Sequence, residues 1–203
     1  MPAEAKNIID LYRRYASAWR QSRGTHLQER KWLDKFLAIQ PPNPKVLDIG
    51  CGPGVPIAGY LIEKGCKVTG VDSAPEMIEI ARDALPGGNW QVADMRTLSI
   101  DAVFHGLLAW NSFFHLTPVD QRRMFPIFRR HAADGAALMF TSGPASGEAM
   151  GSLEGEPLYH ASLDGEEYRQ LLDDNGFAVV DHMIEDPDCG RHTVWIARLR
   201  PAF

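Results

Sequence analysis

Three kinds of pattern are missing from the sequence, and the first is any cysteine arrangement that binds metal. The 203 residues include three cysteines, Cys51, Cys66 and Cys189. They form no CxxC pair, and none has zinc-ligand spacing with a histidine, so we predict no metal site. A sparse, odd number of cysteines is typical of a reducing compartment, and we therefore expect a cytoplasmic protein.

Long apolar runs and an excess of positive charge are missing as well. No run approaches the ~20 residues that a membrane-spanning helix needs. The first residues, MPAEAKNIID, lack the basic segment followed by an apolar one that marks a secretory signal. The formal net charge is −5, whereas proteins that bind a nucleic-acid backbone need a basic surface. We therefore expect neither a membrane nor a nucleic acid as partner.

From Lys45 onward, short apolar runs alternate with helical patterns. This alternation is typical of an α/β fold with a mostly parallel sheet and helices on both faces. The link between the last two apolar runs is too short for a parallel crossover, so these strands should form an antiparallel C-terminal hairpin. Seven strands are expected, over residues 45–50, 67–72, 89–94, 102–110, 136–142, 177–186 and 191–199. Helices are expected over residues 55–64, 73–85, 119–133 and 164–176.

Three local features complete this prediction. Ser73 and Glu76 have the spacing of a capping box at the start of a helix. The N-terminal residues show helical spacing over 8–23 and again over 26–39. Residues 142–162, SGPASGEAMGSLEGEPLYHAS, are rich in glycine and are expected to form a long polar loop, which after a strand is usually functional or mobile.

A cluster of glycines follows the first strand and precedes a helix. Gly50, Gly52 and Gly54 would let the backbone approach a ligand at the carboxyl ends of the strands. Their spacing departs from the dinucleotide fingerprint G-x-G-x-x-G, whose third glycine would stand at Val55, and no P-loop sequence is present. Asp72, at the end of the next strand, suits the ribose hydroxyls of NAD or of another adenosine compound.

Three stretches, taken together, resemble class I S-adenosylmethionine-dependent methyltransferases of the small-molecule type. They are VLDIGCGPG at 46–54, GVDSAPEMI at 70–78 and VADM at 92–95. The first stretch is the most specific, and the others follow it in the expected order. The resemblance covers roughly residues 30–199 and implies a Rossmann-like fold.

The resemblance also implies how the chain is organised and what it binds. A single methyltransferase domain would extend over 1–203, with N-terminal helices or a lid over 1–40 and a cofactor-binding core over 45–199. S-adenosylmethionine would be the cofactor and S-adenosylhomocysteine the product. The partner would be a small-molecule acceptor, and the protein would be a monomer or a homodimer.

The family motifs assign cofactor contacts to particular residues. Asp72 would accept hydrogen bonds from both ribose hydroxyls, because a carboxylate is only an acceptor. Asp94 would accept from the adenine amino group. Asp48 would hold the glycine loop from beneath, or would reach the cofactor's amino group through water. The implied cofactor residues are Asp48, Gly50, Cys51, Gly52, Asp72, Ser73, Met77, Asp94, Met95, Trp110 and Asn111.

The residues after the fourth strand bear on catalysis. His115 is the candidate general base, because its side chain titrates near neutral pH. A purely local packing role for His115 is an equal alternative. Methyltransferases that act on nucleic-acid bases or protein glutamine often carry N/D-P-P-Y/F at this point. This chain has Asn111-Ser112-Phe113-Phe114, which counts against those substrates.

Two segments are expected to shape the acceptor site, namely the N-terminal helix, acting as a lid, and the glycine-rich loop. The candidate acceptor contacts are Tyr15, Trp19, Tyr159 and His160. Acidic residues in the loop favour an amine-bearing acceptor, and they are Glu148, Glu154 and Glu156.

Two alternatives to a methyltransferase stay open at this point. The first is a non-catalytic protein that binds S-adenosylmethionine or S-adenosylhomocysteine, because binding residues and a working active site are separable. The second is a dinucleotide-dependent oxidoreductase on a similar fold, which the glycine spacing opposes.

Overall fold

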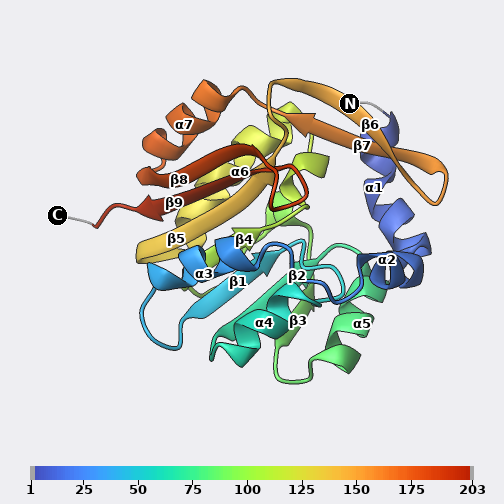
Figure 1. Cartoon of the computed structure of the whole chain (residues 1–203), viewed down its shortest axis with the longest axis horizontal. Helices are drawn as coiled ribbons and strands as arrows, with labels where there is room; N and C mark the ends of the chain where they lie inside the picture. Colours follow the sequence, from blue (N-terminus) through green and yellow to red (C-terminus); the bar gives the residue numbers. More distant parts are fainter. Residues whose placement is uncertain (1–2, 202–203) are drawn as a thin grey trace.

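The computed structural model describes residues 3–201, which are built around a seven-stranded sheet (Figure 1). The strands lie in the order β3-β2-β1-β4-β5-β9-β8. All pairs are parallel except those of β9, which is antiparallel to β5 and to β8. The predicted sheet with its antiparallel C-terminal hairpin is therefore confirmed. The strands are β1 (Lys45–Ile49), β2 (Lys67–Asp72), β3 (Asn89–Val92), β4 (Phe104–Ala109), β5 (Ala132–Ser142), β8 (Phe177–Asp186) and β9 (His192–Leu199).

Helices cover both faces of this sheet, as expected. One face packs against α3, α4 and α5, and the other packs against α6 and α7. No helix within residues 3–201 is long and apolar enough to cross a membrane. The predicted domain ends at residues 1 and 203 lie outside the described residues. The helices are α3 (Arg30–Ala38), α4 (Ile57–Glu63), α5 (Pro75–Ala84), α6 (Pro118–His131) and α7 (Gly165–Asp174).

Strand β1 shows how the apolar runs produce this layered arrangement. Val46 belongs to the core beneath α3, α4 and α5, whereas Leu47 and Ile49 belong to the core beneath α6 and α7. A strand buried on both faces has an apolar side chain at nearly every position. Because β1 is parallel to β2 and β4, the carboxyl ends of the three strands meet at one edge of the sheet.

The N-terminal segment forms two helices and not the single one expected over 8–23. These are α1 (Ala3–Arg14) and α2 (Ala16–Arg23). Tyr15 separates them with φ of −111° and ψ of 20°, which lies outside helical geometry. The apolar spacing continues across the break, so the sequence pattern does not reveal it.

The predicted capping box at the start of α5 does not form. The N-cap residue is Ala74, and its side chain makes no capping hydrogen bond. Instead, the carboxylate of Asp72 accepts a hydrogen bond from the N–H of Ala74 at 2.9 Å. Asp72 therefore caps the chain just before the helix, and Ser73 remains in the pocket described below.

Residues 142–162 do not form the expected loop, because most of them form a β-hairpin. Its strands are β6 (Gly147–Leu153) and β7 (Glu156–Ser162), which pair in a separate antiparallel sheet. The two turn residues, Glu154 and Gly155, have φ of 51° and 83°. Positive φ at both central residues is typical of a tight hairpin turn whose twist matches the strands.

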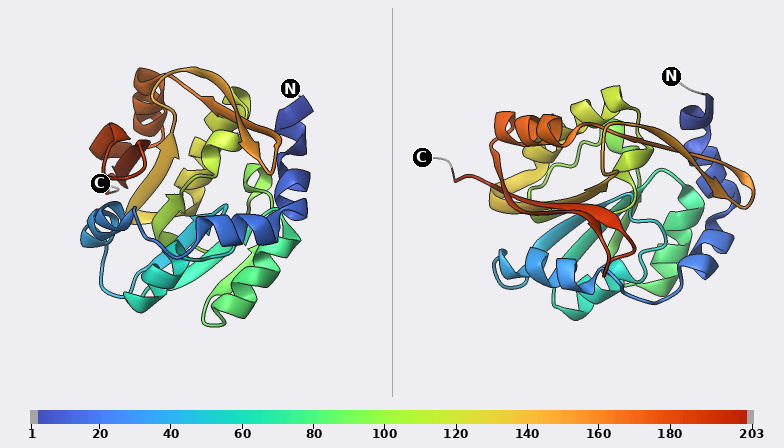
Figure 2. Two further views of the ribbon diagram at one scale, coloured as in Figure 1. Left: turned by 45° about the vertical axis from the view of Figure 1, so that its right-hand side comes forward. Right: turned by 45° about the horizontal axis from the view of Figure 1, so that its top comes forward.

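The hairpin extends beside α1, as both views of Figure 2 show. Leu11 of α1 packs in a small cluster with Leu153 and Leu158 of the hairpin. At the surface, the guanidinium of Arg14 donates to the carboxylate of Glu156 at 2.7 Å. The hairpin therefore holds α1 against the rest of the molecule.

Candidate functional site

A pocket lies at the carboxyl ends of β1, β2 and β4, and residues of α1 and α2 line its other side. Figure 1 shows where these strands and the two helices lie. We call the strand ends with their loops the floor, and α1, α2 and the β6–β7 hairpin the roof. Every residue that the sequence suggested for the cofactor lines this pocket. They are Asp48, Gly50, Cys51, Gly52, Asp72, Ser73, Met77, Asp94, Met95, Trp110 and Asn111.

Two glycines of the floor have positive φ for different reasons. Gly50 and Gly52 have φ of 74° and 53°. A Cβ on Gly50 would lie 2.3 Å from Ser112 Cβ, so glycine is needed for close packing there. A Cβ on Gly52 would meet no atom closer than Trp19 Nε1 at 3.9 Å. The Gly52 backbone therefore faces free space, and glycine leaves room there for a ligand.

Asp72 ends β2, and its carboxylate is held by the backbone. The N–H of Gly52 donates to Oδ2 at 3.0 Å, and the N–H of Ala74 donates to Oδ1 at 2.9 Å. Burial raises the pKa of Asp72, while these backbone hydrogen bonds oppose the rise. Carboxylate oxygens accept more than one hydrogen bond each. Asp72 is thus oriented and keeps acceptor capacity for a pair of hydroxyls.

Asp48 is the second acid of the floor and is only 3% exposed. Burial, followed by the nearby charge of Asp72, raises the pKa of Asp48 to about 7. Near neutral pH this carboxyl is thus protonated in a large fraction of molecules. A cationic ligand would favour its ionised form, because opposite charges lower a carboxyl pKa.

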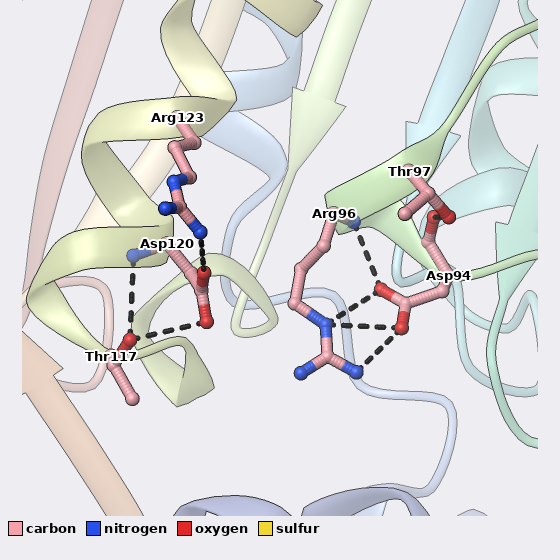
Figure 3. Close-up of polar contacts among 6 residues, drawn as sticks. All are labelled: Asp94, Arg96, Thr97, Thr117, Asp120 and Arg123. Atoms are coloured by element: carbon pink, nitrogen blue, oxygen red, sulfur yellow. Dashed lines mark hydrogen bonds and ion pairs between the residues drawn. The ribbon is translucent and has the colours of Figure 1, made fainter. Parts of the chain in front are cut away.

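Asp94 follows β3 and is tied to Arg96 (Figure 3). Its carboxylate accepts from the Arg96 backbone N–H at 2.9 Å, from Nε at 3.0 Å and from Nη2 at 2.5 Å. Burial acts to raise the pKa of Asp94, but the hydrogen bonds from Arg96 outweigh it, and the pKa is lowered. Asp94 is therefore an ionised acceptor with part of its capacity already used. Sequence reasoning did not identify Arg96, which also lines the pocket.

Two large apolar side chains also line the pocket. Met77 is 1% exposed and packs with Ala16 and Ala74. Trp110 is 5% exposed, and its Nε1 has no hydrogen-bond partner among the described residues. A buried donor without a partner costs free energy. The indole N–H of Trp110 is thus a buried donor without a partner within residues 3–201, enclosed by the surrounding side chains.

The helices of the roof contribute more of the pocket than the sequence suggested. Tyr12 and Trp19 pack edge to face with ring centroids 5.6 Å apart. Arg23 also reaches the pocket, and its guanidinium donates to the fully buried Glu29. The only sequence feature that could have indicated this pocket-facing side of α1 and α2 was the helical spacing of Ile8, Tyr12 and Trp19. The start of α1 adds Ala5, Lys6, Ile8 and Ile9.

His115 lies in a short 3-10 helix after β4, η2 (Phe113–His115), and lines the pocket. Its Nε2 is 2.8 Å from the hydroxyl oxygen of Tyr12, and its Nδ1 is 2.8 Å from the carbonyl oxygen of Tyr159. Burial lowers the pKa of His115 to about 3. Both ring nitrogens are engaged and protonation is disfavoured, so the geometry argues against His115 as a direct general base.

Three of the four expected acceptor contacts lie outside the pocket lining, and Trp19 alone of the four belongs to it. The hydroxyl of Tyr15 donates to Glu156 at 2.7 Å. Tyr159 is 1% exposed. His160 stacks on His115 with ring centroids 4.9 Å apart. These side chains therefore belong to the roof but do not line the pocket.

The acidic residues of the hairpin are not in the pocket lining either. Glu156 forms an ion pair with Arg14 and accepts from Tyr15, so its charge is engaged at the surface. Glu154 occupies the hairpin turn. An amine-bearing acceptor was expected from an acidic loop over the pocket, and the observed hairpin does not support that expectation.

Comparisons with known proteins agree with this geometry. Residues 46–135 match a family model described as a methyltransferase domain. The chain is 38% identical over 95 residues to trans-aconitate 2-methyltransferase from Azoarcus sp. (strain BH72), covering 46% of this chain and 36% of that protein. It is 27% identical over 166 residues to an O-methyltransferase from Pyrenophora dematioidea, covering 75% and 61%. The chain thus spans less than two thirds of the length of these curated relatives.

Solved structures share the fold at low sequence identity. An amino pentose methyltransferase from Micromonospora echinaspora has a TM-score of 0.71 at 20% identity, over 91% of this chain and 95% of that one. The 1,6-didemethyltoxoflavin-N1-methyltransferase from Burkholderia thailandensis has a TM-score of 0.73 at 20% identity, over 98% and 92%. The fold and pocket thus define a Rossmann-like methyltransferase architecture. The match over residues 46–135 and the shared fold make this chain similar to S-adenosylmethionine-dependent methyltransferases.

Proposed function

We propose that this protein transfers a methyl group from S-adenosylmethionine to a small-molecule acceptor. The observation that carries the proposal is the pairing of Asp72 with Gly52. The Gly52 N–H anchors the carboxylate at 3.0 Å, beside backbone that faces free space. An anchored carboxylate suits the two hydroxyls of a ribose, because it is only an acceptor.

The floor fits the adenosine part of this cofactor. Asp72 would hold the ribose hydroxyls, with Ser73 beside it. Asp94 would accept from the adenine amino group with the acceptor capacity that Arg96 leaves. Met77 and Met95 would enclose the adenine ring with apolar surface.

The floor and the roof together fit the amino-acid part. The backbone at Gly50, Cys51 and Gly52 would line it, and Asp48 would face its ammonium group. Arg23, which sequence reasoning did not assign, would meet its carboxylate. The side chains of Trp110 and Asn111 would complete the wall near the reacting group.

The protein's part in the reaction is alignment and exclusion of water. When bound, S-adenosylmethionine supplies a methyl group already activated by a sulfonium. Tyr12 and Trp19 would cover this group and keep water away from it. Alignment of a nucleophile about 3 Å from the methyl carbon accounts for much of the rate gain in such transfers.

The acceptor is proposed to be small, because α1 and α2 cover the pocket that it must enter. We further propose that residues 1–203 act as one domain in the cytosol, where free cysteines such as Cys51 stay reduced. The relatives act on chemically different acceptors, as their names show: trans-aconitate and an amino pentose. Both kinds of compound therefore belong in an acceptor panel.

The first test is calorimetric titration with S-adenosylmethionine, S-adenosylhomocysteine and NAD in parallel, repeated on Asp72→Ala. We expect micromolar binding of the first two and none of NAD. Loss of charge-assisted hydrogen bonds should weaken binding in Asp72→Ala by roughly 100-fold. Asp83→Ala, which removes an exposed carboxylate of α5, is the matched control and should bind as the wild type does.

The second step measures transfer of a labelled methyl group to a panel of small amines, alcohols, phenols and carboxylates. Turnover of any member establishes the activity. Cofactor binding without transfer to any member would favour a non-catalytic binding protein. Binding of NAD in place of S-adenosylmethionine would favour the oxidoreductase alternative.

A further inference from the structure

A chain of hydrogen bonds connects the roof of the pocket to the floor. Tyr12 of α1 places its hydroxyl oxygen 2.8 Å from His115 Nε2. His115 Nδ1 in turn lies 2.8 Å from the backbone carbonyl oxygen of Tyr159 in β7. Tyr12 and His115 both line the pocket. Three segments distant in the sequence therefore meet at the place where an acceptor must bind.

The direction of both hydrogen bonds follows from the backbone carbonyl of Tyr159, the last group in this series. A carbonyl oxygen only accepts, so His115 Nδ1 must carry the hydrogen that bonds Tyr159. His115 is 7% exposed, and burial lowers its pKa to about 3, so the ring is neutral and Nε2 has a free electron pair. Tyr12 must therefore donate its hydroxyl hydrogen to His115 Nε2.

Tyr12 remains a phenol under these conditions. Burial raises its pKa, and the negative charge of Asp72 raises it further. Its single hydrogen is used by His115, so the hydroxyl oxygen has only acceptor capacity left. The Tyr12 ring is also fixed from the side, because Trp19 packs against its edge at 5.6 Å.

We infer that Tyr12 contacts the methyl acceptor and accepts a hydrogen bond from an N–H or O–H of the attacking group. His115 is a positioning residue, which keeps the Tyr12 oxygen in the accepting role. This inference rests on the proposed function and specifies its acceptor. The nucleophile is an amine, an alcohol or a phenol, and a fully ionised carboxylate has no hydrogen to offer Tyr12.

The role of Tyr12 is alignment of the nucleophile's electron pair toward the methyl carbon. A hydrogen bond from the attacking group to a fixed oxygen restricts its rotation, which lowers the entropy cost of reaching the transition state. The bond from the nucleophile to the methyl carbon forms as the sulfur–methyl bond breaks, and that electron pair stays on the sulfur of S-adenosylhomocysteine. The proton of the attacking group passes to water after transfer, because burial opposes an imidazolium at His115. The hydrogen bond should therefore affect kcat more than KM.

The first arm of the test determines the direction of the hydrogen bond between Tyr12 and His115, and it needs no catalytic turnover. Proton–nitrogen correlation NMR of the histidine side chains is recorded on the full chain with S-adenosylhomocysteine, at neutral pH. The expected result is a neutral His115 with its hydrogen on Nδ1, and an Nε2 resonance that shifts in Tyr12→Phe. A hydrogen on Nε2, or a charged ring, would overturn the inference.

The second arm measures methyl transfer to the same acceptor panel, which includes trans-aconitate. Tyr12→Phe should lower kcat by roughly 10- to 100-fold, the loss that one well-placed hydrogen bond predicts. Its affinity for S-adenosylhomocysteine should stay within about twofold of the wild type, since the Tyr12 hydroxyl is assigned to the acceptor. Tyr60→Phe, which removes a hydrogen-bonded hydroxyl outside this pocket, should leave kcat unchanged.

A pair of His115 variants separates positioning from packing. The side-chain oxygen of His115→Gln can accept from Tyr12 and should retain more of kcat than His115→Leu. Equal losses in both variants, or full kcat in Tyr12→Phe, would overturn the inference, as would turnover of trans-aconitate at its ionised carboxylate. Absence of transfer to every acceptor would instead remove the proposed function, and the NMR result would still decide the hydrogen-bond direction.

Discussion

The floor and the roof of the pocket are held in place by different amounts of packing. The floor continues from strands whose side chains belong to the two large cores, such as Val46 and Leu47 of β1. The roof depends on two small clusters, one of Leu11, Leu153 and Leu158 and one of Ala16, Ala74 and Met77, and on ion pairs at the surface. Regions with few buried apolar contacts open at lower free energy. We therefore expect a rigid floor and a roof that opens to admit ligands.

Alanine substitutions at the two glycines of the floor should have the largest effects on the free energy of unfolding, and the two positions should differ. Gly50→Ala places a Cβ 2.3 Å from Ser112 Cβ at a φ of 74°. Overpacking and left-handed strain together should cost about 3–5 kcal/mol of unfolding free energy. Gly52→Ala meets no atom within 3.9 Å, so its cost should be about 1–2 kcal/mol from the backbone alone.

Denaturant unfolding measures these costs, and titration with S-adenosylhomocysteine measures what each change does to the site. Gly52→Ala should fold and yet lose most of its affinity, because the new methyl group occupies ligand space. Equal destabilisation by both substitutions would show that the two glycines do not differ as the geometry indicates.

Asp48 should make the stability of the floor depend on pH. Burial raises the pKa of Asp48 to about 7, so between about pH 4 and pH 7 the folded state binds more protons at this group than the unfolded state does. The unfolding free energy should therefore fall as pH rises through this window. A shift of this size corresponds to roughly 4 kcal/mol at most.

Asp48→Asn isolates this contribution, because the other ionisable groups are common to both proteins. The variant should match the wild type near pH 4 and become progressively more stable relative to it up to about pH 8. Denaturant unfolding across that range checks the difference. A stability difference independent of pH would contradict a raised pKa. S-adenosylhomocysteine should reduce the pH dependence, since its ammonium group favours the ionised acid.

Leucines in the two regions should respond differently to truncation. Leu33 of α3 is fully buried in one of the large cores, and Leu33→Ala should lower the global unfolding free energy by about 3 kcal/mol. Leu11 belongs to one of the small roof clusters, and Leu11→Ala should cost about 2 kcal/mol, mostly as local opening. Amide exchange should then accelerate in α1 and β6–β7 without comparable change in β1 and β4.

The same exchange measurement tests whether the roof closes on ligand. Adding S-adenosylhomocysteine should slow exchange over residues 8–22 in the wild type, because Tyr12 and Trp19 line the pocket. Exchange that is unchanged by the ligand would remove the lid proposal, and uniform acceleration in Leu11→Ala would show that roof and floor unfold together.

The floor could be predicted from the sequence because the residues that form it stand in short motifs at the ends of strands. The glycine cluster, Asp72 and Asp94 stand at the ends of apolar strands, and parallel pairing alone brings strand ends together. What the sequence did not reveal were the partners, such as Arg96 beside Asp94. That contact depends on how the chain turns after β3, and no motif marks it.

The roof could not be predicted because its signals are weak or not local. Strand β6 is mostly exposed, so it lacks the alternation that identifies a half-buried strand. Its turn, Glu154-Gly155, needs positive φ at both residues, for which Asn-Gly or Asp-Gly is the recognisable signal. The contact of Tyr12 with His115 joins residues that are 103 positions apart, and no pattern in a single sequence indicates such a pairing.

The ion pair at the edge of the roof should have the smallest effect and is the strictest test of local opening. Glu156 accepts from Arg14 and Tyr15, and these hydrogen bonds lower its pKa to about 2. The pair is substantially exposed, and exposed pairs add little to global stability. Glu156→Gln should therefore change the thermal unfolding midpoint by no more than about 2 °C.

Its effect should instead appear in the exchange rates of α1, because Glu156 is a direct link between that helix and the hairpin. We expect faster exchange near Arg14 in Glu156→Gln and no change in Glu154→Gln, whose carboxylate lies in the neighbouring turn without a partner in the described chain. Cofactor affinity should fall slightly, because the apparent affinity is reduced in proportion to the fraction of molecules whose roof is closed. A large drop in the unfolding midpoint would mean that the roof is part of the cooperative core, and the distinction between the two regions would then fail.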